Sequence, residues 1–345
     1  MKGAIPNDER CGVLAAGNWI VDRVKIVDRW PQQDALAMIL AQSESNGGCA
    51  YNMLKDLSAL GCGFPLHACG RVGADEDGSW ILSDLQAHGI DAAGLIATEE
   101  APTSYTDVMT VQSTGRRTFF HQRGANAVFS DGDCRLESCR ARILHLGYFG
   151  LLDRLDERGP DGRTGHERLL AAAGALGYLT SADLVSDEGR AFAELVEPCL
   201  PLLDLLFLNE FEGQLLSGIQ AEVSPGKVDP GKMEAQARYA IERGVRRAAI
   251  VHSATGVVAC RTDGTVLRQG AVRVPAGKIK GAAGAGDALS AGVVFGVHEG
   301  WPMGECLELG VCAAALCLED PTCSAGLRPW RECLQRGRAH GYLAF

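Results

Sequence analysis

Short apolar runs alternate with longer amphipathic stretches along most of the chain. The runs at residues 143–146, 205–208 and 248–251 have the length of buried strands, whereas residues 165–174 and 233–243 form longer helical stretches rich in small and apolar residues. Strands that alternate with helices are typical of a parallel sheet covered by helices on both faces. The pattern therefore predicts an α/β fold, with a doubly wound, mostly parallel sheet flanked by helices.

The amino-terminal part fits this pattern and places glycines in its loops. Residues 11–16 form an apolar run that ends at Gly17-Asn18, which predicts a buried strand that delivers a loop to one edge of the sheet. Residues 50–60 have helical spacing and are followed by Gly61, a typical helix stop. Gly47 and Gly48 are therefore expected just before the N-terminus of a helix.

One segment departs from the alternation. Ser104–Val111 and Arg117–Gln122 are two strand-like halves joined by a polar turn that contains Gly115, which predicts a β-hairpin. A hairpin in an α/β chain indicates a small sheet set apart from the main one. Because the sequence has no internal repeat and no low-complexity linker, we expect residues 1–345 to form a single domain.

Charge and hydropathy narrow the classes of partner. The chain has 43 acidic against 33 basic residues, a formal net charge of −10, which disfavours binding to a nucleic acid. Its most apolar stretches, near residues 200–208 and 311–318, are far shorter than the ~20 residues that a membrane-spanning helix needs. We therefore expect a small-molecule partner, with no nucleic acid and no membrane.

The thirteen cysteines are scattered and show no Cys-x-x-Cys pair or zinc-ligand spacing. We interpret them as reduced thiols of the core and expect no direct metal ligand. Residues 1–10 lack the charged-then-apolar pattern of an export signal. Together with the odd cysteine count, this predicts a cytoplasmic protein.

The segment with the clearest chemistry is Gly284-Ala285-Gly286-Asp287, which leads into an amphipathic stretch that ends near Gly300. The free N–H groups and the dipole of a helix N-terminus favour anions, so such a turn can hold a phosphate. Asp287 in the first helical turn is placed to accept a proton from an attacking hydroxyl. The alternative is that Asp287 only caps a helix after a flexible turn.

Several segments together resemble one family. Over nearly its full length the chain resembles the ribokinase-like (PfkB) carbohydrate and nucleoside kinases. In that family a Gly-Ala-Gly-Asp turn forms the anion hole and supplies the base, which implies these roles for Gly284, Ala285, Gly286 and Asp287. Upstream, the run Gly47-Gly48-Cys49-Ala50-Tyr51-Asn52 is similar to the substrate-binding Gly-Gly-x-x-x-Asn of the family, and Asp22, five residues after Gly17, is similar to its hydroxyl-binding Asp.

Two further segments extend the resemblance. Residues 70–78 are similar to a Gly-x-Val-Gly-x-Asp-x-x-Gly segment of the family, which we regard as a marker of the fold. Asn209 and Glu212 match its Asn-x-x-Glu, which implies that they position Mg²⁺ and the phosphates of ATP through water. Without the resemblance, the same residues predict the start of a helix, with Asn209 as N-cap and Glu212 as its capping-box partner.

The resemblance also gives the predicted hairpin a role. It implies a lid over the sugar, inserted at about residues 19–45 and 103–124, with Tyr105, His121 and Arg123 near the substrate. A guanidinium such as that of Arg123 could bind a carboxylate or hydroxyl groups. Cross-strand packing is the alternative for Tyr105 and His121. The exposed edges of a small lid sheet are also compatible with a homodimer formed through the lid.

The chain departs from the family at two places. Members activated by a monovalent cation have Asp-Thr-Thr before the turn, whereas this chain has Gly281-Ala282-Ala283, so we expect no activation by K⁺. The Gly-x-x-Gly of the ATP-side strand is Ser253-Ala254-Thr255-Gly256 here, which leaves only Gly256 as the matching ATP-binding position.

Three functions follow as hypotheses. The first is an ATP-dependent kinase that phosphorylates a hydroxymethyl group of a sugar or sugar acid, with Mg²⁺ as cofactor. The second is a nucleoside kinase, in which Trp19 or Phe120 would provide an apolar slot for the base. The third is a non-catalytic sugar-binding relative. A Walker-type NTPase and a dinucleotide-binding dehydrogenase are excluded, because no Gly-Lys is followed by Ser or Thr and Gly61-Cys62-Gly63 lacks the third glycine.

Overall fold

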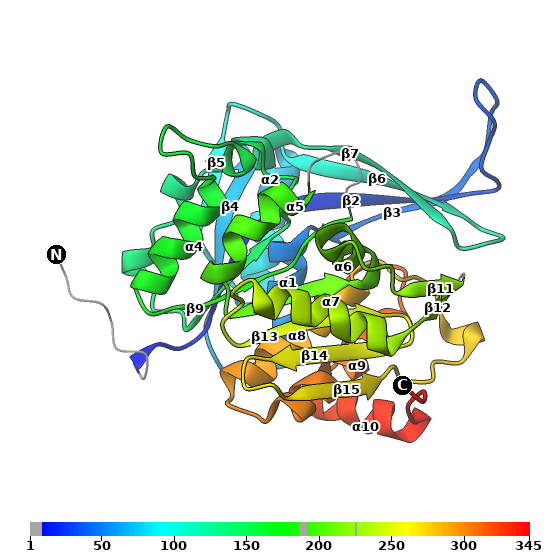
Figure 1. Cartoon of the computed structure of the whole chain (residues 1–345). Helices are drawn as coiled ribbons and strands as arrows, with labels where there is room; N and C mark the ends of the chain where they lie inside the picture. Colours follow the sequence, from blue (N-terminus) through cyan, green and yellow to red (C-terminus); the bar gives the residue numbers. More distant parts are fainter. Residues whose placement is uncertain (1–8, 187–191, 225) are drawn as a thin grey trace.

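The computed structural model describes residues 9–186, 192–224 and 226–345. The prediction that residues 1–10 carry no export signal concerns a stretch of which residues 1–8 lie outside the described residues. Within the described part, nine strands form one large sheet in the order β15-β14-β13-β10-β9-β8-β1-β4-β5 (Figure 1). The bounds of these strands are β1 Val13–Gly17, β4 Leu66–Gly73, β5 Asp91–Thr98, β8 Ile143–Gly147, β9 Leu179–Ala182, β10 Leu205–Asn209, β13 Ala248–Ser253, β14 Gly256–Arg261 and β15 Val266–Gly270.

The large sheet is parallel from β5 to β13, and only the edge strands β14 and β15 run antiparallel to their neighbours. Its strands are buried on both faces, as parallel sheets usually are. In β10, for example, Leu205 and Phe207 pack into one core and Leu206 and Leu208 into the other. The predicted doubly wound, mostly parallel sheet is therefore confirmed.

Helices cover both faces of the sheet. One face is packed against α1 Cys49–Ala59, α2 Glu76–Ala87, α8 Ala285–His298, α9 Met303–Cys317 and α10 Trp330–His340. The other face is packed against α3 Asp153–Asp156, α4 Gly165–Ala175, α5 Phe192–Val196, α6 Glu210–Ser217 and α7 Pro230–Glu242. The described 3₁₀ turns are η2 Gly124–Val128, η3 Asp131–Asp133, η4 Leu136–Ser138, η5 Glu197–Leu202 and η6 Ala276–Lys278.

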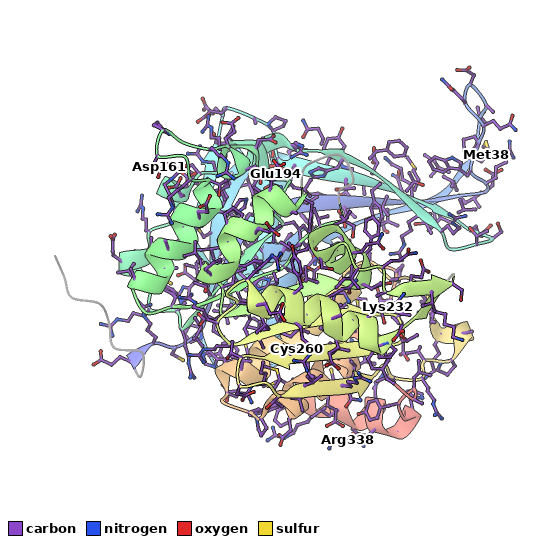
Figure 2. All side chains as sticks on the ribbon, in the orientation of Figure 1. Met38, Asp161, Glu194, Lys232, Cys260 and Arg338 are labelled. Atoms are coloured by element: carbon purple, nitrogen blue, oxygen red, sulfur yellow. A yellow bond between two sulfur atoms is a disulfide. The ribbon has the colours of Figure 1, made fainter. Side chains whose placement is uncertain are left out.

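A separate small sheet projects from this body. Its strands run in the order β3-β2-β6-β7, with bounds β2 Ile20–Val27, β3 Ile39–Gly47, β6 Ser104–Val111 and β7 Arg117–Gln122. The predicted hairpin is β6 and β7, with the predicted bounds. Figure 1 shows the four strands as a long blade, and Figure 2 places Met38 at its far tip. A two-stranded ribbon, β11 Glu222–Ser224 and β12 Lys227–Val228, lies elsewhere on the body.

The order of the strands creates a crevice beside β1. Within the large sheet, β4 is the next strand after β1 and pairs with it on one side, whereas β8 pairs with β1 on the other side. Gly17 and Gly147 are register partners at the ends of β1 and β8. In open α/β sheets, ligands bind at the carboxyl ends of the strands, where the direction of winding changes. The next segments of chain, which begin at Asn18 and Tyr148, therefore line the expected ligand edge.

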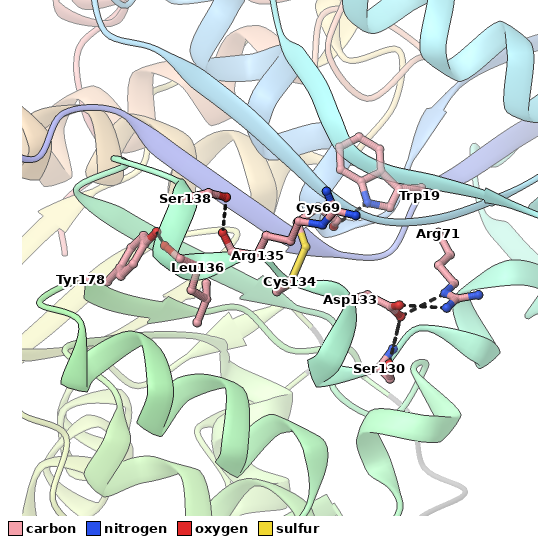
Figure 3. The surroundings of a disulfide bond; sticks show 10 residues. All are labelled: Trp19, Cys69, Arg71, Ser130, Asp133, Cys134, Arg135, Leu136, Ser138 and Tyr178. Atoms are coloured by element: carbon pink, nitrogen blue, oxygen red, sulfur yellow. Dashed lines mark hydrogen bonds and ion pairs between the residues drawn. A yellow bond between two sulfur atoms is a disulfide. The ribbon is translucent and has the colours of Figure 1, made fainter. Parts of the chain in front are cut away.

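One prediction about the cysteines is wrong. Cys69 in β4 and Cys134 form a disulfide with a Cα–Cα distance of 6.2 Å, beside the bidentate ion pair of Arg71 with Asp133 (Figure 3). The two cysteines are 65 residues apart, so their spacing gave no sign that the fold brings them together. The eleven other cysteines are free thiols, and most of them are buried, as predicted.

The residues described here include no helix long and apolar enough to cross a membrane.

Candidate active site

A cavity of about 1320 Å³ lies at the carboxyl ends of the strands, between the large sheet and the small one. Its walls come from the strand-end loops, from the start of α8, and from strands β2, β6 and β7 of the small sheet. The small sheet is the segment predicted as a lid and is called the lid below. Of the residues predicted to form the site, those that line this cavity are Asp22, Gly48, Asn52, Arg123, Asn209, Glu212, Gly284, Ala285, Gly286 and Asp287.

The turn at Gly284 is shaped for an anion. Gly284 has a φ of 74°, a left-handed conformation that favours glycine, and α8 starts at the next residue. Ala285 N–H reaches Ala282 O at only 3.4 Å, and within the described residues no hydrogen bond of the Gly286 or Asp287 N–H group is formed. These N–H groups lie at the positive end of the helix dipole, in residues that line the cavity, an arrangement that attracts phosphate oxygens.

Asp287 is buried at the start of α8, and two side chains hold its carboxylate. Asn52 Nδ2 donates to Oδ2 at 2.8 Å, and Tyr148 Oη lies 2.8 and 2.9 Å from the two carboxylate oxygens. Burial raises the pKa of Asp287 to about 6, and the hydrogen bonds from Asn52 and Tyr148 oppose that rise. A carboxylate with this pKa is ionised at neutral pH and still basic enough to take a proton.

Tyr148 is a site residue that the sequence did not predict. It follows β8 directly at the crevice, and its backbone N–H bonds the side chain of Asn18. Burial and the neighbouring Asp287 raise the pKa of the phenol, so Tyr148 donates its proton to the carboxylate and does not release it. No recognisable motif surrounds Tyr148, and only its place after a strand next to β1 could have indicated it.

Asp22 and Gly47 lie side by side across β2 and β3. A Cβ atom at Gly47 would lie 2.3 Å from Asp22 Oδ1, so only glycine leaves room for the carboxylate. Burial raises the pKa of Asp22 to about 7, while hydrogen bonds from the Cys323 thiol and from Thr106 oppose the rise. Asp22 is thus a partly exposed residue at the cavity, and its Oδ2 lies 3.7 Å from Cys323 Sγ.

Gly48 and Asn52 fix the start of α1 against the crevice. Gly48 is the N-cap of α1 with a φ of 87°, and a Cβ atom there would lie 2.7 Å from the carbonyl oxygen of Asn18. Asn46 donates to Asn52 Oδ1 at 2.7 Å, which leaves the Asn52 amide nitrogen to donate to Asp287. Asn46 is thus a second residue that the sequence analysis missed, and it sets the orientation of the Asn52 amide.

Asn209 and Glu212 occupy the end of β10 and the first turn of α6. Both predicted roles in the helix start are present, because Asn209 caps α6 and the Glu212 carboxylate accepts a hydrogen bond from the Asn209 N–H. The Glu212 carboxylate also accepts from Ser186 at 3.0 Å. Burial raises the pKa of Glu212 to about 7. A neighbouring buried acid, Asp183, lines the same wall, and burial also raises the pKa of its carboxyl group.

Gly256, like Gly47, is a predicted site residue that does not line the cavity. It begins β14, and a Cβ atom there would lie 2.7 Å from the ring of Phe345, so the residue packs against the carboxyl-terminal segment. The preceding His252, Ser253 and Ala254 line the cavity, whereas Gly256 does not. Gly256 therefore helps to form the turn whose earlier residues face the cavity.

Of the three lid residues predicted near the substrate, two line the cavity and one does not. His121 lines the cavity and pairs with Thr106 Oγ1 at 3.0 Å, and Arg123 lines it while its Nη1 bonds Asp153 and the carbonyl oxygen of Gly150. Tyr105 does not line it, because the Arg23 guanidinium stacks 4.5 Å from its ring centroid.

Neither aromatic residue predicted for a base slot faces the cavity. Trp19 is fully buried and donates its indole N–H to the carbonyl oxygen of Cys69, and Phe120 stacks on Trp30 at 6.1 Å. The cavity is lined instead by Phe119, the next residue on the opposite face of β7. The prediction failed because the two faces of a strand alternate, and the sequence did not show which face of β7 turns inward.

Residues 13–331 match the model of the family described as pfkB family carbohydrate kinase. The chain belongs to the pfkB family of carbohydrate kinases. A relative named as an uncharacterized sugar kinase of Archaeoglobus fulgidus is 24% identical over 263 residues, which cover 75% of this chain and 93% of the relative.

Solved structures share the fold of this pfkB kinase. The ribokinase of Arabidopsis thaliana, in a complex with ribose and ATP, has a TM-score of 0.76 at 21% identity, covering 95% of this chain and 99% of its own. The nucleoside kinase of Methanocaldococcus jannaschii, an archaeal member of the ribokinase family, has a TM-score of 0.73 at 20% identity, covering 98% and 100%. The solved structures share the fold, and membership of the pfkB family makes the chain a kinase that transfers a phosphoryl group to a hydroxyl.

Proposed function

We propose that this pfkB kinase transfers the γ-phosphoryl group of ATP to a hydroxymethyl group of a sugar or sugar acid, with Asp287 as the base. The observation that supports the proposal most strongly is the position of Asp287, a buried carboxylate in the same short turn as the free N–H groups of α8. Phosphoryl transfer needs a group that takes the hydroxyl proton and a group that stabilises the transferred charge, and this turn supplies both.

The proposed step involves one proton and one phosphoryl group. The acceptor oxygen forms a bond to the γ-phosphorus while the bond from that phosphorus to the bridging oxygen of ADP breaks. The hydroxyl proton moves to the carboxylate of Asp287, which Asn52 and Tyr148 hold in place. The N–H groups at Ala285 and Gly286 stabilise the charge on the phosphoryl oxygens during transfer.

The acceptor would lie between α1 and the lid. Asp22, beside Gly47, would accept hydrogen bonds from its hydroxyl groups, and Gly48 with Asn52 would hold the hydroxymethyl end near Asp287. Arg123 also lines the cavity. Within the described residues only its Nη1 has a hydrogen-bond partner, so its other N–H groups could bind an acidic or hydroxylated acceptor.

The residues on the nucleotide side suit a hydrated Mg²⁺. Glu212 and Asp183 are buried acids whose carboxyl pKa values are raised because burial penalises their charge, and a divalent cation would relieve that penalty. Mg²⁺ keeps much of its water and needs few direct ligands, so Asn209 and Glu212 would hold it through water. When bound, the ion would neutralise charge on the phosphates. We infer no activation by K⁺ and a cytoplasmic location, where ATP is available.

A nucleoside is a second candidate acceptor, supported by one feature of the cavity. Phe119 from β7 lines the cavity, as do Ile20 and Leu151, so the lining includes aromatic and aliphatic side chains. A flat base could stack on such a wall, whereas a simple sugar leaves it unused.

A coupled assay of ADP release over a panel of sugars, sugar acids and nucleosides tests the proposal. We expect sugars or sugar acids with a free hydroxymethyl group to stimulate ADP release, and Asp287→Asn to remove the stimulation. If only nucleosides stimulate release, the second candidate is correct. Stimulation by no member of the panel would overturn both. A parallel assay in KCl and in choline chloride tests the inference about K⁺, which a marked stimulation by KCl would refute.

A further inference from the structure

A lid arginine reaches the segment that precedes the phosphate-binding turn. Arg117 is the first residue of β7, and its guanidinium lies against Gly281. A Cβ atom at Gly281 would lie only 2.2 Å from Arg117 Nη2, so the guanidinium occupies the space of the side chain that Gly281 lacks. The lid thereby contacts the segment before the turn through Arg117, a residue that belongs to none of the motifs and does not line the cavity.

The Arg117 guanidinium lies near one acid and two thiols. Asp22, Cys317 and Cys323 are the groups close enough to interact with its charge, and burial lowers the pKa of Arg117, although a guanidinium stays protonated in proteins. Within the described residues no hydrogen bond or ion pair of this side chain is formed, so its N–H groups have no competing anchor.

The two cysteines also contact the phosphate-binding turn. Cys317 Sγ lies 3.2 Å from the carbonyl oxygen of Ala283 and 3.1 Å from that of Cys323, and these two oxygens share its single S–H donor. A Cβ atom at Gly284 would lie 2.8 Å from the backbone oxygen of Cys323. The guanidinium therefore lies at Gly281, near the place where residues 281–284 meet residues 317–323.

We propose that Arg117 is a positioning residue for phosphoryl transfer: its cation, delivered by the lid, holds the Gly281–Gly284 segment in the conformation that aims the α8 N–H groups at the phosphate. This proposal deepens the function proposed above and depends on it. A cation is needed here because Asp183, Asp287 and Glu212 are buried acids, Asp22 is a partly buried one, and ATP adds further negative charge. Since Arg117 belongs to the lid, the turn would be set only when the lid is in place.

The test compares Arg117→Ala with Arg116→Ala, a matched loss of charge at an exposed neighbour in the same hairpin. We expect Arg117→Ala to lower kcat by about tenfold or more, with KM for ATP close to that of the wild type, because the lost contact acts on the turn during transfer. Arg116→Ala should keep wild-type kcat, and Arg117→Lys should retain much of the rate. Added guanidinium ion, at concentrations that do not unfold the protein, should restore part of the activity of Arg117→Ala.

Gly281→Ala provides a second, independent variant. Its new methyl group would displace the guanidinium, so the variant should reproduce the kcat loss of Arg117→Ala while Arg117 is still present. Wild-type kcat in Arg117→Ala would overturn the inference, as would a loss of kcat that neither Lys nor guanidinium ion relieves. If the wild type itself releases no ADP with any acceptor, the proposed function fails, and that outcome is distinct from a failure of the inference about Arg117.

Discussion

Asp287 is held by two donors that stabilise its ionised form. Asn52 and Tyr148 both donate to the carboxylate and counteract the effect of burial, which raises its pKa to about 6. A base must be ionised to accept a proton, so turnover should fall as the pH drops through about 6. The phenol of Tyr148 is the only one of the two donors that the sequence gave no reason to expect.

Tyr148→Phe tests this balance. Removing the phenol removes a hydrogen bond that lowers the pKa of Asp287, so that pKa should rise and the acid limb of the kcat profile should move to higher pH. At pH 8 and above, where Asp287 is ionised in both proteins, the rates should converge. A profile measured from pH 5 to pH 9 decides the matter, and an acid limb that stays at the wild-type pH would contradict the role of the phenol.

The ionised carboxylate of Asp22 lowers the stability of the folded protein at neutral and higher pH. Its pKa is about 7 in the folded protein, above the value of an exposed carboxyl group, so the unfolded chain loses this proton first as the pH rises. The stability that protonated Asp22 provides is present below pH 4 and is lost as the pH rises through 7. Asp22→Asn should therefore be more stable than the wild type at pH 8 and should lose this advantage near pH 4, with weaker acceptor binding throughout. Thermal unfolding at the two pH values measures it, and an equal difference at both would argue against it.

At the scale of elements, the turn before α8 depends on a glycine for two separate reasons. Gly284 has a φ of 74°, which costs an L-residue about 1–2 kcal/mol, and its Cβ position lies 2.8 Å from Cys323. Gly264 has a similar φ of 84° with nothing within 4 Å of its Cβ position, which makes it a matched control.

Gly284→Ala should therefore move the turn, whereas Gly264→Ala should only strain the backbone. We expect kcat to fall about 10²-fold in Gly284→Ala, because the N–H groups of α8 would no longer point at the phosphate. Gly264→Ala should lose a similar amount of backbone stability and keep its kcat. Steady-state kinetics and thermal unfolding of both variants provide the comparison, and equal kcat values in the two would show that the turn tolerates the shift.

The elements themselves were largely predictable. The alternation of apolar and polar residues gave β6 and β7 with their bounds, because each residue of a half-buried hairpin is either inward or outward. Asp22, Asn52 and Asp287 were predictable because they belong to a motif series, and they do line one cavity. Tyr148, Asn46 and Arg117 were not, since their roles come from contacts between segments far apart in the chain.

The same limit explains the errors. The bond between Cys69 and Cys134 spans 65 residues and depends on how β4 meets the loop after η3. Phe119 rather than Phe120 lines the cavity, because the twist of the lid decides which face of β7 turns inward. Patterns within one segment describe that segment well, but they do not determine how two segments pack.

At the scale of the whole molecule, the lid leaves apolar surface uncovered. Its tip and edge expose large apolar side chains, among them Trp30, Leu36, Met38, Ile39 and Leu40. Figure 2 shows Met38 at the end of the blade, away from the body. Because β3 is an edge strand with unpaired backbone groups, a second copy of the lid would cover both its apolar side chains and its edge.

We therefore expect a homodimer joined through the lid. Light scattering should give twice the 36.6 kDa of one chain. Leu40→Glu, which places a charge on the exposed edge strand, should reduce the mass to that of one chain, whereas Val223→Glu, an equally exposed position on β11, should leave it unchanged. The mass of a single chain for the wild type would refute this assembly.

The turnover of Asp287→Asn tests the central claim most directly. Asparagine keeps the shape of the side chain and cannot take the proton, so we predict a fall in kcat of about 10²–10⁴-fold, with ATP affinity by calorimetry and thermal stability close to the wild type. Turnover at the wild-type rate in this variant would contradict the assignment of Asp287 as the base.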